Sequence, residues 1–163
     1  MVATTGVPKP EESMIENRTM PDAAVMPVLV YKDVPAACEW LCRVFGFRER
    51  WRAGNHRAQL EIDGGAVVLG EARTGASGEP AEGMTFAPEP HGRVSHEVMV
   101  RVADADTHFE QARDCGAEVL QSPRDYAYGE RQYTAIDLGG HHWTFSQSIA
   151  DVTPEDWGGV TAG

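Results

Sequence analysis

Basic charge is scarce in this chain. Its 163 residues include 14 Lys and Arg against 25 Asp and Glu, which gives a formal net charge of -11. A protein that binds nucleic acid needs a basic face that displaces counterions from phosphates, and the sequence has no Lys/Arg cluster. No apolar run approaches the ~20 residues that cross a bilayer. We therefore expect neither a nucleic-acid partner nor a membrane partner.

Cysteine is also rare, and its arrangement excludes a disulfide framework. The three residues Cys38, Cys42 and Cys115 are odd in number and fit no such spacing. Buried free thiols in a reducing compartment are the simpler interpretation. The N-terminus has no basic start followed by an apolar core, as a secretory signal would. These features together predict a cytoplasmic protein.

What the sequence does contain is one order of elements that occurs twice: strand, helix, strand, strand, strand. The first helix has Asp33 as its cap and Gly46 at its end, and the second is capped by Asp104 or Asp106 and ends at Gly116. Residues 122–125 predict a turn. The predicted strands are 26–33, 47–53, 56–62, 66–72, 96–102, 117–122, 131–137 and 141–147.

Such an internal repeat predicts an α+β fold built from two similar halves, each a curved sheet with a helix on its outer face. The remaining faces can then enclose a cavity. Between the halves lies a long connection rich in Gly, Pro and Glu. The expected boundaries are a disordered tail at 1–23, a first module at 24–72, a linker at 73–93, a second module at 94–148 and a C-terminal tail at 149–163.

Three stretches resemble the vicinal oxygen chelate superfamily, which includes glyoxalase I, extradiol dioxygenases and bleomycin-resistance proteins. VLVYKDVPAACEWLCRVFGF resembles the start of its first module, and VRVADADTHFEQARDCGAEVL resembles the start of its second. YGERQYTAIDLGGHHWTFSQSIADVTPEDWGG resembles the end of the PhnB-like branch. The resemblance covers about residues 26–160. It implies paired βαβββ modules that form mixed sheets around a cavity, and a homodimer.

In metal-using members of that superfamily, four ligands lie on the first and fourth strands of each module. The corresponding positions here are Met26, Val68, Glu97 and Thr144, and a shift of one residue in register would put His96 in place of Glu97. A thioether and an isopropyl group cannot hold a hard or borderline divalent ion. The resemblance therefore implies the fold, whereas the residues predict no metal and no other cofactor.

The leading hypothesis is a metal-free protein that binds a small organic molecule in the cavity between its modules, because a largely apolar cavity with a few polar groups suits such ligands. Alternation along the strands assigns the lining, since successive side chains face opposite sides of a sheet. The expected lining residues are Met26, Val28, Val30, Val68, Glu97, Met99, Arg101, His142 and Thr144.

The alternative is an enzyme, either a glyoxalase-type lyase or isomerase or a dioxygenase with an unusual metal site. Acid-base chemistry would then use Glu97, whose pKa burial could raise, together with His142. Glu97 could instead form an ion pair with Arg101. The neighbouring His141 is expected to be a polar turn or surface residue. A third hypothesis places the function in the dimer surface, with Trp157 in an exposed apolar patch.

Overall fold

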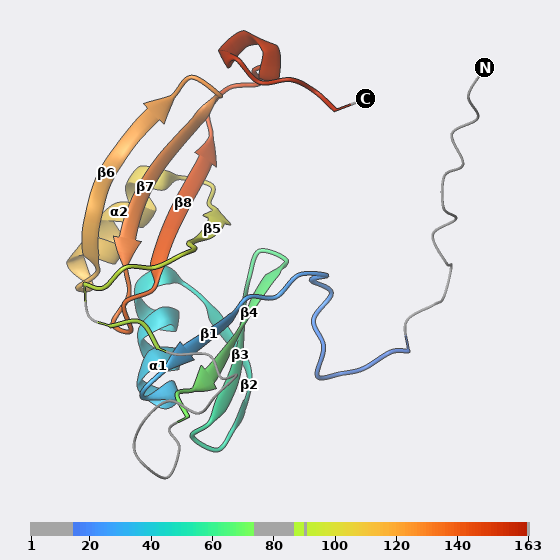
Figure 1. The fold of residues 1–163 in the computed structure, drawn as a ribbon, viewed down its shortest axis with the longest axis vertical. Coiled ribbons are helices and arrows are strands. Elements are labelled where there is room, and N and C mark those ends of the chain that lie inside the picture. Colours follow the sequence, from blue (N-terminus) through green and yellow to red (C-terminus); the bar gives the residue numbers. More distant parts are fainter. Residues whose placement is uncertain (1–14, 74–86, 90, 163) are drawn as a thin grey trace.

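Two four-stranded sheets, each with one helix, make up the computed structural model of the chain, which describes residues 15–73, 87–89 and 91–162 (Figure 1). Residues 1–14 of the predicted tail at 1–23, and most of the predicted linker at 73–93, lie outside these residues. The strand orders are β1-β4-β3-β2 and β5-β8-β7-β6. In each sheet one pair is parallel, β1 with β4 and β5 with β8, and the other pairs are antiparallel. The α+β fold with two βαβββ modules is confirmed.

The elements follow the predicted order. Module 1 contains β1 (Val28–Tyr31), α1 (Val34–Phe45), β2 (Arg48–Ala53), β3 (Arg57–Ile62) and β4 (Gly65–Glu71). Module 2 contains β5 (Val98–Arg101), α2 (Ala105–Asp114), β6 (Glu118–Tyr126), β7 (Glu130–Ile136) and β8 (His142–Ser148), and a 3-10 helix follows at Pro154–Trp157. None of the helices in the described residues is long and apolar enough to span a membrane.

The helix ends lie where their capping residues predict. The Asp33 carboxylate accepts a hydrogen bond from the backbone N–H of Ala36 at 2.9 Å, and Gly46 ends α1 at a φ of 78°. At α2, Asp104 rather than Asp106 is the cap, and it accepts from the N–H of Thr107 at 2.9 Å. Short-range rules suffice here because a cap satisfies N–H groups that the helix itself leaves free.

The predicted turn at 122–125 is wrong, because β6 runs through it as a continuous strand. The pairing of β6 with β7 shifts register between Val119 and Gln121 and again between Gln121 and Arg124. Pro123 lies within the second irregularity. Proline cannot donate to a sheet ladder, but an edge strand with a bulge tolerates it, and β6 is an edge strand.

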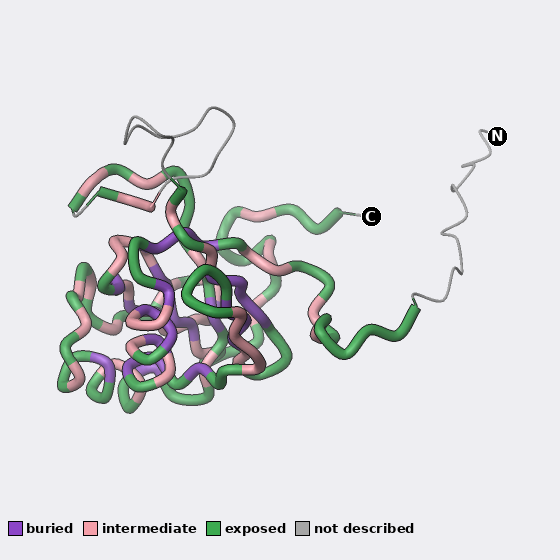
Figure 2. Tube along the Cα trace, turned by 90° about the horizontal axis from the view of Figure 1, so that it is seen from below, coloured by how far each residue is buried: buried purple, intermediate pink, exposed green. Residues whose placement is uncertain are grey.

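The helix-covered faces of both sheets share one hydrophobic core (Figure 2). Strand residues of module 1, such as Leu29 and Leu69, belong to the same buried cluster as Trp143 and Phe145 of module 2. The ring of Phe45, at the end of α1, lies 5.6 Å from Trp143 and 4.7 Å from Phe145, centroid to centroid. The two modules are therefore joined through their helix sides.

A buried carboxylate fixes this junction. Asp137, in the turn after β7, is 5% exposed and accepts four hydrogen bonds. One of its oxygens accepts from the Tyr31 hydroxyl at 2.6 Å and from the Trp143 indole at 2.9 Å. The other accepts from the backbone N–H groups of Gly139 at 2.8 Å and His141 at 3.0 Å. Burial and the neighbouring Asp137 raise the pKa of Tyr31 well above its usual value, so this hydroxyl remains a donor.

Replacing this carboxylate should destabilise the whole fold. In Asp137→Asn, the side-chain NH2 replaces one of the two carboxylate oxygens and then faces hydrogen-bond donors that need an acceptor. We therefore expect the free energy of unfolding to fall by about 2–4 kcal/mol. Tyr31→Phe removes one of the four bonds and should cost less than Asp137→Asn. Urea denaturation measures both. The control is Asp125→Asn, which breaks an exposed ion pair with Arg131 and should cost under about 1 kcal/mol. An equal effect of Asp137→Asn and Asp125→Asn would contradict this account.

Candidate functional site

Within the described residues, each sheet has a second face that neither α1 nor α2 covers, called here its helix-free face. In module 1, the pairing of Val28 with Val68, and of Val68 with Gln59, puts these three residues side by side on that face. Their neighbours along the strands belong to the core. Val28 is half exposed, whereas Val30 and Val68 are buried. Met26 joins the same group, since its sulfur lies 3.8 Å from the Gln59 amide nitrogen.

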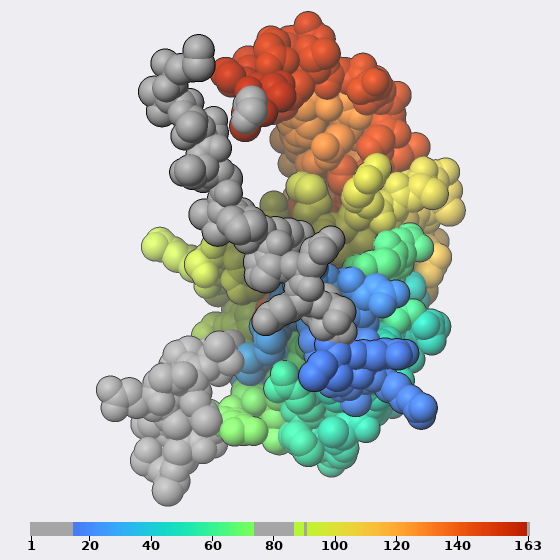
Figure 3. Space-filling view, turned by 90° about the vertical axis from the view of Figure 1, so that its right-hand side faces the viewer, coloured from blue at the N-terminus to red at the C-terminus, as the bar shows by residue number. Residues whose placement is uncertain are grey.

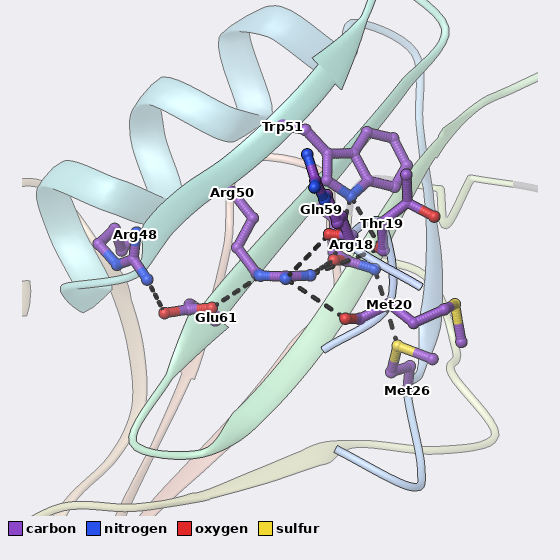
Figure 4. A network of polar contacts seen from close by, with 9 residues as sticks. All are labelled: Arg18, Thr19, Met20, Met26, Arg48, Arg50, Trp51, Gln59 and Glu61. Atoms are coloured by element: carbon purple, nitrogen blue, oxygen red, sulfur yellow. Dashed lines mark hydrogen bonds and ion pairs between the residues drawn. The ribbon is translucent and has the colours of Figure 1, made fainter. Parts of the chain in front are cut away.

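Polar side chains from β2 complete this face (Figure 4). Gln59 is only 2% exposed. Its amide oxygen accepts from the Trp51 indole at 3.1 Å and from the Arg50 guanidinium. Arg50 also pairs with Glu61 at 2.9 Å. Arg50 and Trp51 are consecutive residues of β2, yet both reach Gln59. They can do so because the pairing of β2 with β3 shifts register between Glu49 and Trp51.

The helix-free face of module 2 is more polar. Met99 lies beside Thr144 in the β5–β8 pairing and is 55% exposed. The Thr144 hydroxyl donates to Glu97 at 3.0 Å and lies 3.1 Å from the hydroxyl of Thr134 on β7. Further along the strands, Ser146 and Gln132 both donate to Glu130. Nearly every polar group on this face therefore has a protein partner.

Two sequence interpretations on this face need correction. Glu97 and Arg101 do not pair: Arg101 donates to the Ser148 hydroxyl at 3.3 Å, and Glu97 accepts from Thr144. Glu97 is also exposed, so the burial that its role as a base assumed is missing in the single chain. His142 begins β8, is half-buried and pairs with Ile136.

The structure groups the predicted lining residues into two sets. Met26, Val28, Val30 and Val68 belong to module 1, and Glu97, Met99, Arg101, His142 and Thr144 belong to module 2. A hollow of about 360 Å³ lies where β4 begins beside β5. Of the predicted residues it contains only Met99 and Arg101, together with Val25, Pro27, Phe47 and Ala66 among others.

The positions that correspond to metal ligands do not suit a divalent ion. Met26 and Val68 offer a thioether and methyl groups, and the Thr144 hydroxyl is engaged with Glu97. Across residues 15–73, 87–89 and 91–162, no three His, Cys, Asp or Glu side chains are grouped so that they could hold a metal. Neither the donor set nor its arrangement fits the metal that the superfamily resemblance implies.

The prediction that His141 is a turn or surface residue is right only for the turn, which His141 closes by accepting from the Asp137 N–H at 3.0 Å. It is not a surface residue: it is 4% exposed, and its ring packs against that of Tyr31 with centroids 4.7 Å apart. Its Nε2 lies 2.9 Å from the carbonyl oxygen of Val30 in β1 and must donate to it, because a carbonyl only accepts. Burial lowers the pKa of His141 below its usual value. His141 therefore links the two modules through the Val30 carbonyl, a partner that the sequence does not indicate.

His108 on α2 links the modules in the same way. Its Nε2 donates to the Phe45 carbonyl oxygen at 3.1 Å, so its Nδ1 accepts from the Tyr133 hydroxyl. Both ring nitrogens are thus used by the neutral imidazole. Burial lowers the pKa of His108 and raises that of Tyr133. Because they are engaged with each other in the core, the His108 ring and the Tyr133 hydroxyl are not free to transfer a proton to a ligand.

The sequence interpretation missed Arg50, Gln59 and an aromatic cluster in module 2. Tyr126 stacks on Tyr128 at 5.0 Å between centroids, and Trp157 meets Tyr128 edge-on at 5.7 Å. Trp157 is therefore anchored, although 44% of it is exposed. The signal for Arg50 and Gln59 was their occurrence as polar residues within two predicted strands, but which face each occupies depends on the bulge in β2.

Comparisons with known proteins agree with the fold. Residues 23–145 match the family described as the Glyoxalase/Bleomycin resistance protein/Dioxygenase superfamily. Uncharacterized proteins of Mycobacterium bovis and Mycobacterium tuberculosis are 26% identical over 140 residues, which is 83% of this chain and 90% and 80% of theirs.

Solved structures give the same result. TioX from Micromonospora sp. ML1 is 32% identical, with a TM-score of 0.60 over 80% of this chain and 100% of TioX. A glyoxalase/bleomycin resistance protein/dioxygenase from Nocardioides is 24% identical, with a TM-score of 0.58 over 88% of this chain and 93% of that protein. The second likeness concerns the fold alone.

The two buried histidines should make the protein sensitive to acid. In the unfolded chain a histidine takes up a proton near pH 6.5, whereas His108 and His141 in the folded chain do so only at lower pH. The unfolded state then binds more protons, so the free energy of unfolding falls as the pH drops below about 6.5.

Urea midpoints between pH 7.5 and 5.5 test this. His141→Gln keeps a donor for the Val30 carbonyl but cannot titrate, so its midpoint should fall less with acid than that of the unmodified protein. His56→Gln, at an exposed position in the β2–β3 turn, is the matched control and should leave the pH dependence unchanged. A His141→Gln variant as acid-sensitive as the control would refute the account.

Proposed function

The chain belongs to the Glyoxalase/Bleomycin resistance protein/Dioxygenase superfamily, and from that premise we propose that it binds a small organic molecule on its helix-free faces without a metal. The YGERQYTAIDLGGHHWTFSQ stretch favours the PhnB-like branch of the superfamily. Free cysteines favour a cytoplasmic site of action.

One observation carries the proposal: uncovered apolar side chains lie beside fixed polar groups on these faces. Val28 and Met99 are 51% and 55% exposed, although both lie in strands, β1 and β5, rather than in loops. Next to Met99, the Thr144 hydroxyl and the Glu97 carboxylate are held by hydrogen bonds. Apolar surface with a few oriented polar groups is typical of sites for organic ligands. The poor fit of the ligand positions to a divalent ion supports a metal-free mode of binding.

We further propose that the protein acts as a homodimer. Within one chain the two helix-free faces belong to different sheets, and each keeps an exposed apolar residue, Val28 on one and Met99 on the other. A second copy can place its module 2 face against the module 1 face of the first, and two-fold symmetry repeats the contact. Each cavity would then be lined by both sets of predicted residues.

A thermal-shift screen of small organic compounds, with aromatic cations first, tests ligand binding. A compound at 100 times its Kd should raise the melting temperature by roughly 5–10 °C. Val28→Asp should abolish the shift, because it puts a charge on the apolar part of the face. Val160→Asp, at an exposed C-terminal position, should leave it intact. Parallel titrations with Zn, Ni, Fe and Mn must give no shift, since tight binding of one ion would instead support the metal-dependent enzyme.

The oligomeric state is a separate measurement. Light scattering coupled to size exclusion should give twice the chain mass, and Met99→Lys should raise the dimer Kd about tenfold or more, because it places a charge in an apolar contact. Leu138→Lys, which alters an exposed apolar residue in the β7–β8 turn, serves as the control. A monomeric unmodified protein, or equal effects of the two lysines, would rule out this dimer.

A further inference from the structure

The backbone of an N-terminal segment, Asn17–Met20, lies on the helix-free face of module 1 (Figures 3 and 4). The Trp51 indole donates to the carbonyl oxygen of Thr19 at 3.0 Å. The Arg50 guanidinium approaches three consecutive carbonyl oxygens, those of Arg18, Thr19 and Met20, at 3.4–3.5 Å. Two side chains of β2 thus bind three successive peptide carbonyls.

Among the described residues, little else holds the segment. Residues 15–20 are all exposed, so no side chain of the segment is buried against the sheet. Its shape comes from a local turn, in which the Asn17 side chain accepts from the Thr19 N–H at 3.0 Å and the Thr19 hydroxyl at 2.8 Å. A segment with few buried contacts opens at low free-energy cost.

The donors beneath it are held by more contacts to the sheet than the segment is. Buried Gln59 fixes the Trp51 indole and Arg50, and Glu61 fixes the Arg50 side chain from the other end. The Arg50 contacts to the carbonyls are longer than the usual 2.7–3.2 Å for N–H···O bonds, which leaves room for a closer acceptor. Because Glu61 already supplies a negative charge to Arg50, neutral carbonyl oxygens suit the remaining donors.

Space for a ligand adjoins these donors. A hollow of about 210 Å³ lies between the N-terminal segment and the β3–β4 turn, and its walls include Met20, Pro21, Arg50, Glu61 and Gly65. A molecule that enters there meets Arg50 directly. It can take over the donors as the segment withdraws.

We propose that Arg50 and Trp51, oriented by Gln59, form a carbonyl-binding centre, and that Asn17–Met20 is its internal competitor. The ligand class is a small molecule with two or more neighbouring amide or ester carbonyls, whose oxygens replace those of residues 18–20. This inference rests on the proposed ligand-binding function and specifies the chemistry of its module 1 face.

The test is a titration of the full-length ¹⁵N-labelled protein with acetyl-trialanine amide, a carbonyl-rich probe, followed through the indole N–H resonance of Trp51. Trp51→Phe assigns that resonance among those of the four tryptophans. The resonance should move on titration with the peptide and stay in place with 1,6-hexanediol, which has no carbonyl. Asn17→Ala loosens the segment, so the apparent Kd of the peptide should fall about threefold or more, because the competent state is more populated.

Arg50→Lys should weaken the peptide at least fivefold, because lysine lacks the planar fork of donors. Arg48→Lys is the matched control, since Arg48 pairs with the same Glu61 but has no contact with the segment, and it should bind as the unmodified protein does. Equal Kd values for Asn17→Ala and the unmodified protein would show that the segment is not a competitor and would overturn the proposal. So would equal Kd values for Arg50→Lys and Arg48→Lys.

The methyl resonances of Val28 and Val68 separate this inference from the proposed function. If compounds from the thermal-shift screen move these methyl resonances and no carbonyl-bearing compound moves the Trp51 indole, the carbonyl-binding centre is wrong and the proposed function stands. If neither set of resonances responds to any compound, both are wrong. Joint movement of both sets, lost in Arg50→Lys for the indole alone, is the expected result.

Discussion

The buried carboxylate of Asp137 is the interaction on which the rest of the architecture depends. Its four hydrogen bonds come from β1, from β8 and from the turn that joins β7 to β8, so a single side chain sets the distance between the modules. Gly139 permits the approach, because a Cβ there would lie 2.5 Å from the Tyr31 ring. A buried charge costs much to desolvate, and only this complete set of donors makes it tolerable. His141 and His108 then reinforce the same junction from either side.

The junction directs the two sheets' functional surfaces away from the core. The helix sides of both modules are buried in one hydrophobic cluster. Within the described residues, the helix-free faces are therefore the only broad sheet surfaces that remain for a ligand or a second copy. The two faces differ in character. Module 1 offers valines and a Met around donors aimed outward, whereas module 2 offers hydroxyls and carboxylates that are already paired with each other.

The sequence predicts well what short-range chemistry decides. Asp33 and Gly46 bound α1 because caps and left-handed glycines act over a few residues, and strand alternation correctly puts Val28 and Val68 on one face. The sequence does not predict the long-range contacts. Nothing near His141 shows that the Val30 carbonyl will meet its ring, and nothing near Pro123 shows that β6 will run on along a sheet edge. The β2 bulge likewise decides that both Arg50 and Trp51 reach Gln59, so this part of the site had to come from the structure.

A protein made of two like halves invites the view that each half is a self-sufficient unit. The shared core argues otherwise. Trp143 needs Phe45 and Phe47 of the other half as neighbours, and the Tyr31 hydroxyl needs an acceptor that lies more than a hundred residues away along the chain. Each half can therefore vary only where the other does not touch it. The helix-free faces are the surfaces that the other half does not touch. This explains how one scaffold can carry two chemically different surfaces.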